Sequence, residues 1–399
     1  MGAVPERDSY DVVIVGGAIM GSAVAWFLTD LGFDGRILVV DRDMSFERSA
    51  TATSTSCIRQ QFSTELNVKI SQFGAEFISN LRAFMGGDSR VPQLGIRNFG
   101  YLYLADSNGF AKDLRDRAAV QVAAGAATRL LTPEQIRKLY PFYALDDIVL
   151  GSINTRGEGY FDSMAVFEWL RRQAIERGVE YVEDEAIGMD VAGGSVRSVT
   201  LASGARIACG QVINAAGPRA GHVAAIAGID LPVEPRKRYS WVFKAEAPLD
   251  RDLPLTIDPS GLHVRENGGG TYQAGGHFGD DLAVAFDDFE MDHGLWEAEV
   301  WPLLAARIPQ FEAIRLTHSW VGHYEMNVFD HNAVLGPHPD IANFLFINGF
   351  SGHGLQQAPA MGRGLAEWLC FGGYQTLDLS GFGYDRLLNS APQVEKAVI

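Results

Sequence analysis

Residues 11–43 decide the fold, and they read DVVIVGGAIMGSAVAWFLTDLGFDGRILVVDRD. A short apolar run ends at a glycine-rich turn, a helix-compatible stretch ends at Gly32, and a second apolar run ends on Asp41. Short apolar runs rich in β-branched residues are typical of buried parallel strands, and glycine is a common helix stop. The stretch therefore predicts a strand–helix–strand unit in which the glycine turn opens the helix.

Such a unit is typical of a dinucleotide site. Backbone N–H groups at the helix N-terminus can bind a pyrophosphate, and the carboxylate of Asp41 can accept a hydrogen bond from a ribose hydroxyl. The usual spacing is G-x-G-x-x-G, and here Ala18 replaces the second glycine, so a methyl group narrows the approach of the pyrophosphate. The alternative is an ordinary α/β crossover with a glycine turn. The predicted contacts are Gly16, Gly17, Ala18, Ile19, Met20, Gly21 and Asp41.

The composition of the chain limits the classes of protein to which it can belong. The chain has 399 residues, of which 47% are apolar, so it can bury a large core and is expected to hold two closely joined domains. The formal charge of −16 disfavours nucleic acid as a partner. The sequence contains no run of eighteen apolar residues, so we expect no membrane span. The three cysteines are far apart and show no metal-ligand spacing, which suits a reducing compartment. We expect a cytoplasmic protein.

Further elements follow along the chain. Residues 49–56 read SATATSTS, and this run is either a flexible loop or the lining of a phosphate or ribityl chain. Apolar spacing predicts a long amphipathic helix over residues 66–84, and Thr132 begins a capping box that precedes another helix. A third helix follows Asp162 and stops at Gly178. Short strands then form a meander that ends in a small-residue turn at residues 215–218.

The second half carries charged runs and a second glycine turn. The basic run at residues 236–238 could bind an anion, but such runs are more often solvated strand ends, and residues 280–292 read as a solvated acidic loop. A helix is predicted over residues 294–308. Residues 344–347 form an apolar strand that leads into NGFSGHGLQQAP at residues 348–359, where Pro359 should place the helix start close to itself. The positive end of this helix could face an electron-rich ring.

The N-terminal unit, the Ala215-Ala216-Gly217 turn and the segment GFSGHGL (349–355) together resemble the D-amino-acid oxidase superfamily of FAD enzymes, which includes sarcosine oxidase and glycine oxidase. The resemblance spans residues 10–389. The segments LPVEPRKRY (231–239), GHGLQQAP (352–359) and QTLDL (375–379) resemble the FAD-dependent oxidoreductase domain proteins within it, whose mitochondrial member assists respiratory complex I assembly.

The resemblance implies a Rossmann-like FAD-binding domain of residues 1–89, 146–220 and 323–399. It is interleaved with a substrate domain of residues 90–145 and 221–322 on a large mixed or antiparallel sheet. FAD would lie extended, with its pyrophosphate over the first turn and its isoalloxazine ring beside the second. The implied FAD contacts beyond the first turn are Asp41, Arg42, Ser49, Ser54, Thr55, Ser56, Ile187, Ala216, Gly217, Gly349, Ser351, Gly352, His353, Gly354, Leu355 and Gln356.

Arg59 falls where sarcosine oxidases bind the substrate carboxylate, and a guanidinium suits that task. Its alternative role is a structural ion pair. Gln356 and Gln273 stand where those enzymes carry a second carboxylate-binding lysine and an oxygen-activating lysine, so reoxidation by O₂ should be slow and another acceptor should be favoured. Gly322 matches the position of their flavin-linking cysteine, which implies non-covalent FAD.

Three functions remain open. The first is oxidation of the C–N bond of a small amino acid or N-alkylated amino acid, with Arg59, Gln356, His353 and an aromatic wall including Tyr324 at the site. The electron acceptor would be O₂, a quinone or an electron-transfer protein, and the chain would be a monomer or small homo-oligomer. The second is a 2-hydroxy-acid dehydrogenase, which needs a histidine base, with His353, His323 and His263 as candidates. The third is a flavin-binding assembly protein without turnover.

Overall fold

The computed structural model describes residues 4–397, and residues 11–43 form the predicted strand–helix–strand unit. β1 (Ser9–Val15) and β2 (Ile37–Asp41) pair in parallel, and α1 (Ile19–Asp30) connects them. Residues 12–14 and 37–40 are buried, and α1 is buried from Ile19 to Leu28. Burial on all sides explains the continuous apolar runs in the sequence.

The first sheet contains eight strands, and its order is β17–β18–β11–β1–β2–β8, with β10 and β9 continuing antiparallel from β11. β11 pairs in parallel with β1 and β18, which confirms a buried strand ending at residue 214. The bounds are β8 (Glu180–Glu183), β9 (Ala186–Ala192), β10 (Ser195–Leu201), β11 (Arg206–Asn214), β17 (Val334–Pro337) and β18 (Phe344–Asn348).

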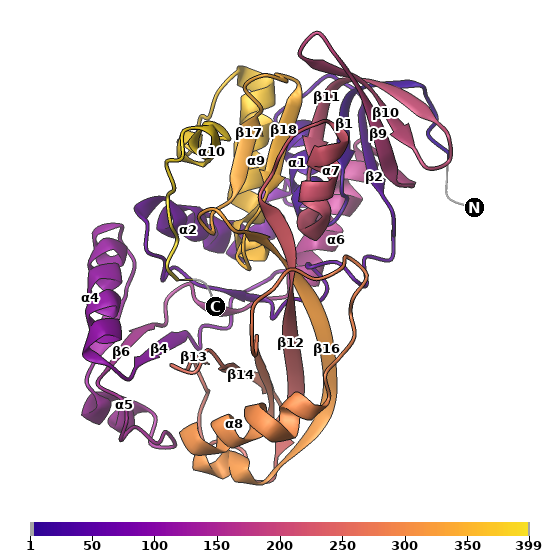
Figure 1. Ribbon diagram of the computed structural model, residues 1–399. Helices are drawn as coiled ribbons and strands as arrows, with labels where there is room; N and C mark the ends of the chain where they lie inside the picture. The colour runs from indigo at the N-terminus through magenta and orange to yellow at the C-terminus, as the bar shows by residue number, and fades with distance from the viewer. Residues whose placement is uncertain (1–3, 398–399) are drawn as a thin grey trace.

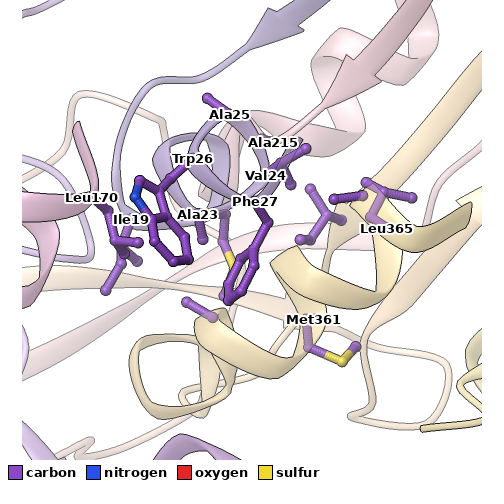
Figure 2. Close-up of a cluster of buried hydrophobic side chains, with 14 of the residues drawn as sticks. Ile19, Ala23, Val24, Ala25, Trp26, Phe27, Leu170, Ala215, Met361 and Leu365 are labelled. Carbon is purple, nitrogen blue, oxygen red and sulfur yellow. The ribbon is translucent and has the colours of Figure 1, made fainter. Parts of the chain in front are cut away.

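Helices cover both faces of this sheet (Figure 1). On one face α1 packs against α2 (Glu65–Ser79), α6 (Ser163–Glu176) and α9 (Gly354–Phe371), and on the other lies α7 (Ala220–Ile226). Figure 2 shows the centre of the larger core, where Phe27 of α1 lies on the side of α9, which carries Met361 and Leu365, and Trp26 lies on the side of Leu170. This packing fixes the two helix N-termini relative to the sheet.

The second sheet also has eight strands, in the order β16–β12–β15–β14–β13–β4–β6–β5. One face packs Trp241, Phe243 and Tyr272 against α8 (Trp301–Arg307), and the other face points toward the first sheet. The bounds are β4 (Tyr101–Ala105), β5 (Arg129–Leu131), β6 (Leu150–Asn154), β12 (Val233–Ala245), β13 (Leu255–Ile257), β14 (His263–Gly268), β15 (Thr271–Gly276) and β16 (Ile314–Asn327).

The long strands β12 and β16 run from the first body of the molecule into the second (Figure 1). The division of the chain into two domains stays a prediction. The pairing of β6 with β4 and β5 places residues 150–154 in the second sheet, although the predicted boundary at residue 146 assigned them to the FAD-binding part.

Most predicted helices form. Asp162 caps α6, and Thr132 and Gln135 make the reciprocal capping-box bonds of α5 (Pro133–Leu139). The helix predicted over 66–84 is divided into α2 and α3 (Leu81–Phe84). The helix predicted over 294–308 begins at Gly294 and contains a π-helical segment, η2 (Trp296–Val300), before α8. The remaining bounds are β3 (Cys57–Ile58), α4 (Asn108–Ala123), β7 (Gly159–Tyr160), η1 (Gly217–Arg219), η3 (Pro309–Glu312), η4 (Ser380–Phe382) and α10 (Asp385–Leu388).

The helix start expected near Pro359 is wrong. α9 begins at Gly354, and the carbonyl of His353 already accepts from the N–H of Gln357. Pro359 is the sixth residue of α9, so it lies inside the helix and removes one bond of the ladder, the one that an N–H at this position would make to the carbonyl of Leu355. Across residues 4–397, the helices are all too short or too polar to cross a bilayer.

Candidate active site

One large cavity lies between the two sheets and measures about 2210 Å³ with its open mouth included. Most predicted site residues line it. From the first turn to the small-residue loops these are Gly16, Ala18, Ile19, Met20, Asp41, Arg42, Ser49, Ser54, Thr55, Ala216 and Gly217, and around the second turn they are Arg59, Tyr324, Ser351, Gly352, His353, Gly354, Leu355 and Gln356.

The first turn is shaped by close backbone contacts. A Cβ atom on Gly16 would lie 2.3 Å from the carbonyl oxygen of Ala215, and one on Gly21 would lie 1.9 Å from the carbonyl oxygen of Gly16. The Asp41 carboxylate accepts from the N–H of Gly17 at 2.7 Å, and burial raises the pKa of Asp41. Since this cradle and the N-terminus of α1 face the cavity, the residues present fit a pyrophosphate.

Glu325 organises the second turn. Its carboxylate accepts from the N–H of Gly349 at 3.0 Å, its carbonyl accepts from the N–H of Ser351, and burial raises the pKa of its side chain to about 8. A Cβ atom on Gly352 would lie 2.3 Å from the ring of Tyr324, so that ring packs directly on the turn. The N-terminus of α9 is therefore held at the cavity wall.

Arg59 is buried, with 1% of its surface exposed. Its backbone N–H donates to Gln356 Oε1 at 2.7 Å, and Nη1 donates to the carbonyl of Gln61 at 2.9 Å and to the hydroxyl of Tyr103. Nη2 donates to the carbonyl of Ala397. These are all neutral acceptors.

No carboxylate within residues 4–397 forms an ion pair with Arg59, so the structural ion pair has no partner there. A guanidinium has five N–H donors. Three have protein acceptors within the described chain, which leaves Nε–H and one Nη2–H. Two guanidinium N–H groups can donate to the two oxygens of a carboxylate.

Gln273 does not line the cavity. It lies on the same face of the second sheet as His263, because Gly275 pairs with His263 and Gln273 stands two residues before Gly275. Its Oε1 accepts from Arg265 Nη2 at 2.6 Å, and Arg265 is 4% exposed. A buried guanidinium therefore lies beside Gln273.

Five further predicted residues stay outside the cavity lining. Gly17, Gly21 and Gly349 shape the two turns through their backbone, and the hydroxyl of Ser56 lies 2.7 Å from that of Ser163. Ile187 is 55% exposed on β9. The three residues Asp184, Glu185 and Ala186, which precede it, line the cavity instead of Ile187.

The segment 280–292 contributes to the lining of the cavity, which was not predicted from the sequence. Phe286, Asp287 and Phe289 line the cavity, and both phenylalanines are half-buried, so the interpretation as solvated surface is wrong. The signal was the pair of aromatic residues within the acidic run, since a fully solvated loop has no need of them. Arg48, Arg219 and His222 also line the cavity and were not predicted.

The three candidate histidines line the cavity, but all have lowered pKa values. Burial lowers the pKa of His263 to about 3, and nearby Arg265 and Arg238 add to the effect. Burial lowers the pKa of His353 well below its usual value, and Nε2 has no partner among the described residues. His323, whose pKa burial also lowers, lies 2.8 Å from the carbonyl of Asp288. All three imidazoles are weak bases here.

Gly322 lies where β16 passes the small-residue loop. A Cβ atom there would be 2.5 Å from Thr53 Oγ1, so a side chain does not fit without movement of Thr53. This contact is consistent with an unlinked cofactor.

Comparisons with known proteins show the family of the chain. A family model described as DAO, FAD dependent oxidoreductase, matches residues 11–368. The FAD-dependent oxidoreductase domain-containing protein 1 of Xenopus laevis is 36% identical over 430 residues, covering 99% of this chain and 85% of that protein. The sarcosine oxidase subunit beta of Rhizobium meliloti (strain 1021) is 26% identical over 97% of this chain and 86% of its own length. The crystal structure of L-proline dehydrogenase from P. horikoshii has a TM-score of 0.84 at 23% identity, covering 97% of this chain and 100% of that one.

Proposed function

Because this chain belongs to the DAO family of FAD-dependent oxidoreductases, we propose that it oxidises the C–N bond of a small amino acid or an N-alkylated amino acid. FAD, when bound, supplies the acceptor for the hydride that leaves the carbon next to nitrogen. The imine product would then hydrolyse. The observation that carries this proposal is Arg59, a buried guanidinium at the cavity with no carboxylate partner in residues 4–397.

Arg59 would bind the substrate carboxylate with the two N–H groups that have no acceptor within residues 4–397. A cation at this position also offsets the repulsion between an anionic substrate and a chain of net charge −16. Gln356 fixes the Arg59 backbone through its Oε1, and Tyr324 forms an aromatic wall against the second turn. These groups position the substrate and exclude water, which is what hydride transfer from an amine requires.

The histidines favour an amine over an alcohol. The nitrogen lone pair of a neutral amine carries the positive charge that develops as hydride leaves, so no strong base is needed. A 2-hydroxy acid must lose its O–H proton to a base. Since burial lowers the pKa of His263, His323 and His353, none of these is well matched to that task near neutral pH.

Anaerobic reduction of the purified yellow protein tests the proposal. A panel of N-methyl amino acids, amino acids and 2-hydroxy acids should be compared with matched amines and amides that lack the carboxylate. Bleaching of the flavin by an amino acid but not by its amide supports the proposal. Bleaching by hydroxy acids alone would indicate the alcohol dehydrogenase, and no bleaching by any member would favour the assembly protein.

The cofactor would be non-covalent, because Gly322, at the position that the resemblance gives to the flavin-linking cysteine, carries no thiol. Acid precipitation should then leave all of the FAD in the supernatant. The acceptor that reoxidises the enzyme would be O₂, a quinone or an electron-transfer protein, and comparison of air with an artificial quinone under single-turnover conditions would distinguish them. The cytoplasmic location and the oligomeric state stay predictions.

A further inference from the structure

Two charged runs that the proposed reaction does not use contact each other. They are the basic residues 236–238 of β12 and the acidic segment 280–292, here called the strap. Lys237 Nζ lies 2.6 Å from a carboxylate oxygen of Asp288. Arg238 makes two hydrogen bonds to the carboxylate of Asp281, at 2.7 and 2.9 Å. The two runs therefore form an ionic latch between the strap and the second sheet.

The backbone of the strap also pairs with β12, just beyond the end of β15. The N–H of Val284 donates to the carbonyl of Pro235 at 3.0 Å, and Arg236 and Ala283 form an isolated antiparallel bridge. β15 ends at Gly276, opposite Tyr239, so the strap takes the position that a longer β15 would occupy. One side of the strap is thus anchored to a fixed strand.

The other side carries two aromatic rings over the cavity. The ring centroid of Phe286 lies 4.8 Å from the guanidinium carbon of Arg219. The ring of Phe289 stacks on His323 with centroids 4.1 Å apart, and the guanidinium carbon of Arg48 lies 5.5 Å from the same ring. All five residues line the cavity. Contacts of aromatic rings with cations and other rings are individually modest, and they can open without loss of the fold.

The cationic partners of these rings come from two segments of the first body that also carry predicted FAD contacts. Arg219 ends η1, which begins at Gly217, and Arg48 directly precedes Ser49. The strap therefore spans the cavity between the small-residue loops of the first sheet and strand β16 of the second. We propose that the strap is the gate of the cofactor cavity, which opens for FAD to enter or leave and holds bound FAD through Phe286 and Phe289.

The rate of FAD exchange tests this gate independently of turnover. Holoprotein is mixed with an excess of isotopically labelled FAD, and retained flavin is measured by mass spectrometry after desalting. The Phe286→Ala/Phe289→Ala variant should exchange FAD about tenfold faster than the wild type, since both ring contacts are removed. The matched control is Leu282→Ala, because Leu282 belongs to the strap, is 66% exposed and does not line the cavity. Equal exchange by wild type and double-phenylalanine variant would overturn the proposal.

A disulfide lock provides the opposite perturbation and keeps both rings. Arg236 and Ala283 are a non-hydrogen-bonded antiparallel pair, because the adjacent pair of Pro235 and Val284 carries the ladder bond. Such pairs have the closest Cα atoms, about 4.5 Å apart, which suits a disulfide. The oxidised Arg236→Cys/Ala283→Cys variant should exchange FAD at least about tenfold more slowly than the same protein after reduction. Equal exchange rates in the two redox states would show that FAD leaves by another route and would overturn the gate. If the double-phenylalanine variant is isolated without flavin, the comparison of the oxidised and reduced disulfide variant tests the gate in its place.

Discussion

Replacement of Arg59 by methionine separates the substrate-binding role of this residue from its structural contacts. Methionine keeps much of the buried volume and removes the charge. If the guanidinium binds the substrate carboxylate, the substitution removes a charge-assisted contact of about 1.5–3 kcal/mol. At about 1.4 kcal/mol for each factor of ten, the apparent substrate constant should rise roughly ten- to a hundredfold.

The same substitution also changes stability. It leaves the carbonyls of Gln61 and Ala397 and the hydroxyl of Tyr103 without their donor, and each buried unsatisfied group costs about 1–3 kcal/mol. The substitution also removes the buried charge of Arg59, which lacks a carboxylate partner in the described chain, and this removal raises stability. We therefore expect a loss of stability smaller than the sum of the three costs, measured as the change in Tm of the holoprotein.

Steady-state kinetics on an amino acid and on its amide provide the decisive comparison. Arg59→Met should raise KM for the acid and leave KM for the amide nearly unchanged, with FAD still bound. Arg265→Met is the matched control, because Arg265 is an equally buried guanidinium that does not line the cavity. An equal rise in KM for acid and amide, or an equal effect of Arg265→Met, would refute the carboxylate-binding role of Arg59.

Three further outcomes follow from the structure. Gly21→Ala should lose FAD on gel filtration, since its Cβ would lie 1.9 Å from a carbonyl oxygen of the turn, whereas Gly109→Ala, which has open space around it, should stay yellow. Burial raises the pKa of Glu158 to about 8, so the stability that this carboxyl contributes is fully present below about pH 4.5 and is lost as pH rises toward 8. Between these pH values Glu158→Gln should flatten the decline in the free energy of unfolding, measured by chemical denaturation, by up to about 1.4 kcal/mol per pH unit. Gln273→Lys would place an ammonium beside the guanidinium of Arg265, so thermal unfolding should show destabilisation and stopped-flow reoxidation should show no gain in the O₂ rate.

Local patterns were sufficient to predict much of the first sheet. The apolar runs of β1 and β2, the glycine turn between them and the capping box at Thr132 depend on neighbours within a few residues, and each is confirmed. The helix start at Gly354 was missed because Pro359 lies inside α9, where the packing of the helix against α1 and α2 outweighs the loss of one hydrogen bond.

Long-range contacts were the part that sequence could not supply. The pairing of Lys237 with Asp288 joins positions 51 residues apart, and neither run by itself indicates its partner. The same limit applied to Gln273, where the sequence showed the loss of a lysine but not the guanidinium of Arg265 beside it. The electrostatic potential at a site is the sum of the contributions of all charges around it. The residue at one position therefore does not determine that potential.

Charged side chains line both ends of the cavity, but only one end pairs them. Beside β2, the half-buried carboxylate of Glu185 forms ion pairs with Arg42 and Arg219, whereas the buried guanidinium of Arg59 lines the end beside the second turn. Paired and partly solvated charges largely cancel, but a buried cation without a carboxylate partner in the described chain is screened much less. A small anion that enters the cavity therefore gains most at the Arg59 end, despite the net negative charge of the whole chain. This local asymmetry supports an amino acid carboxylate as the group that the site recognises.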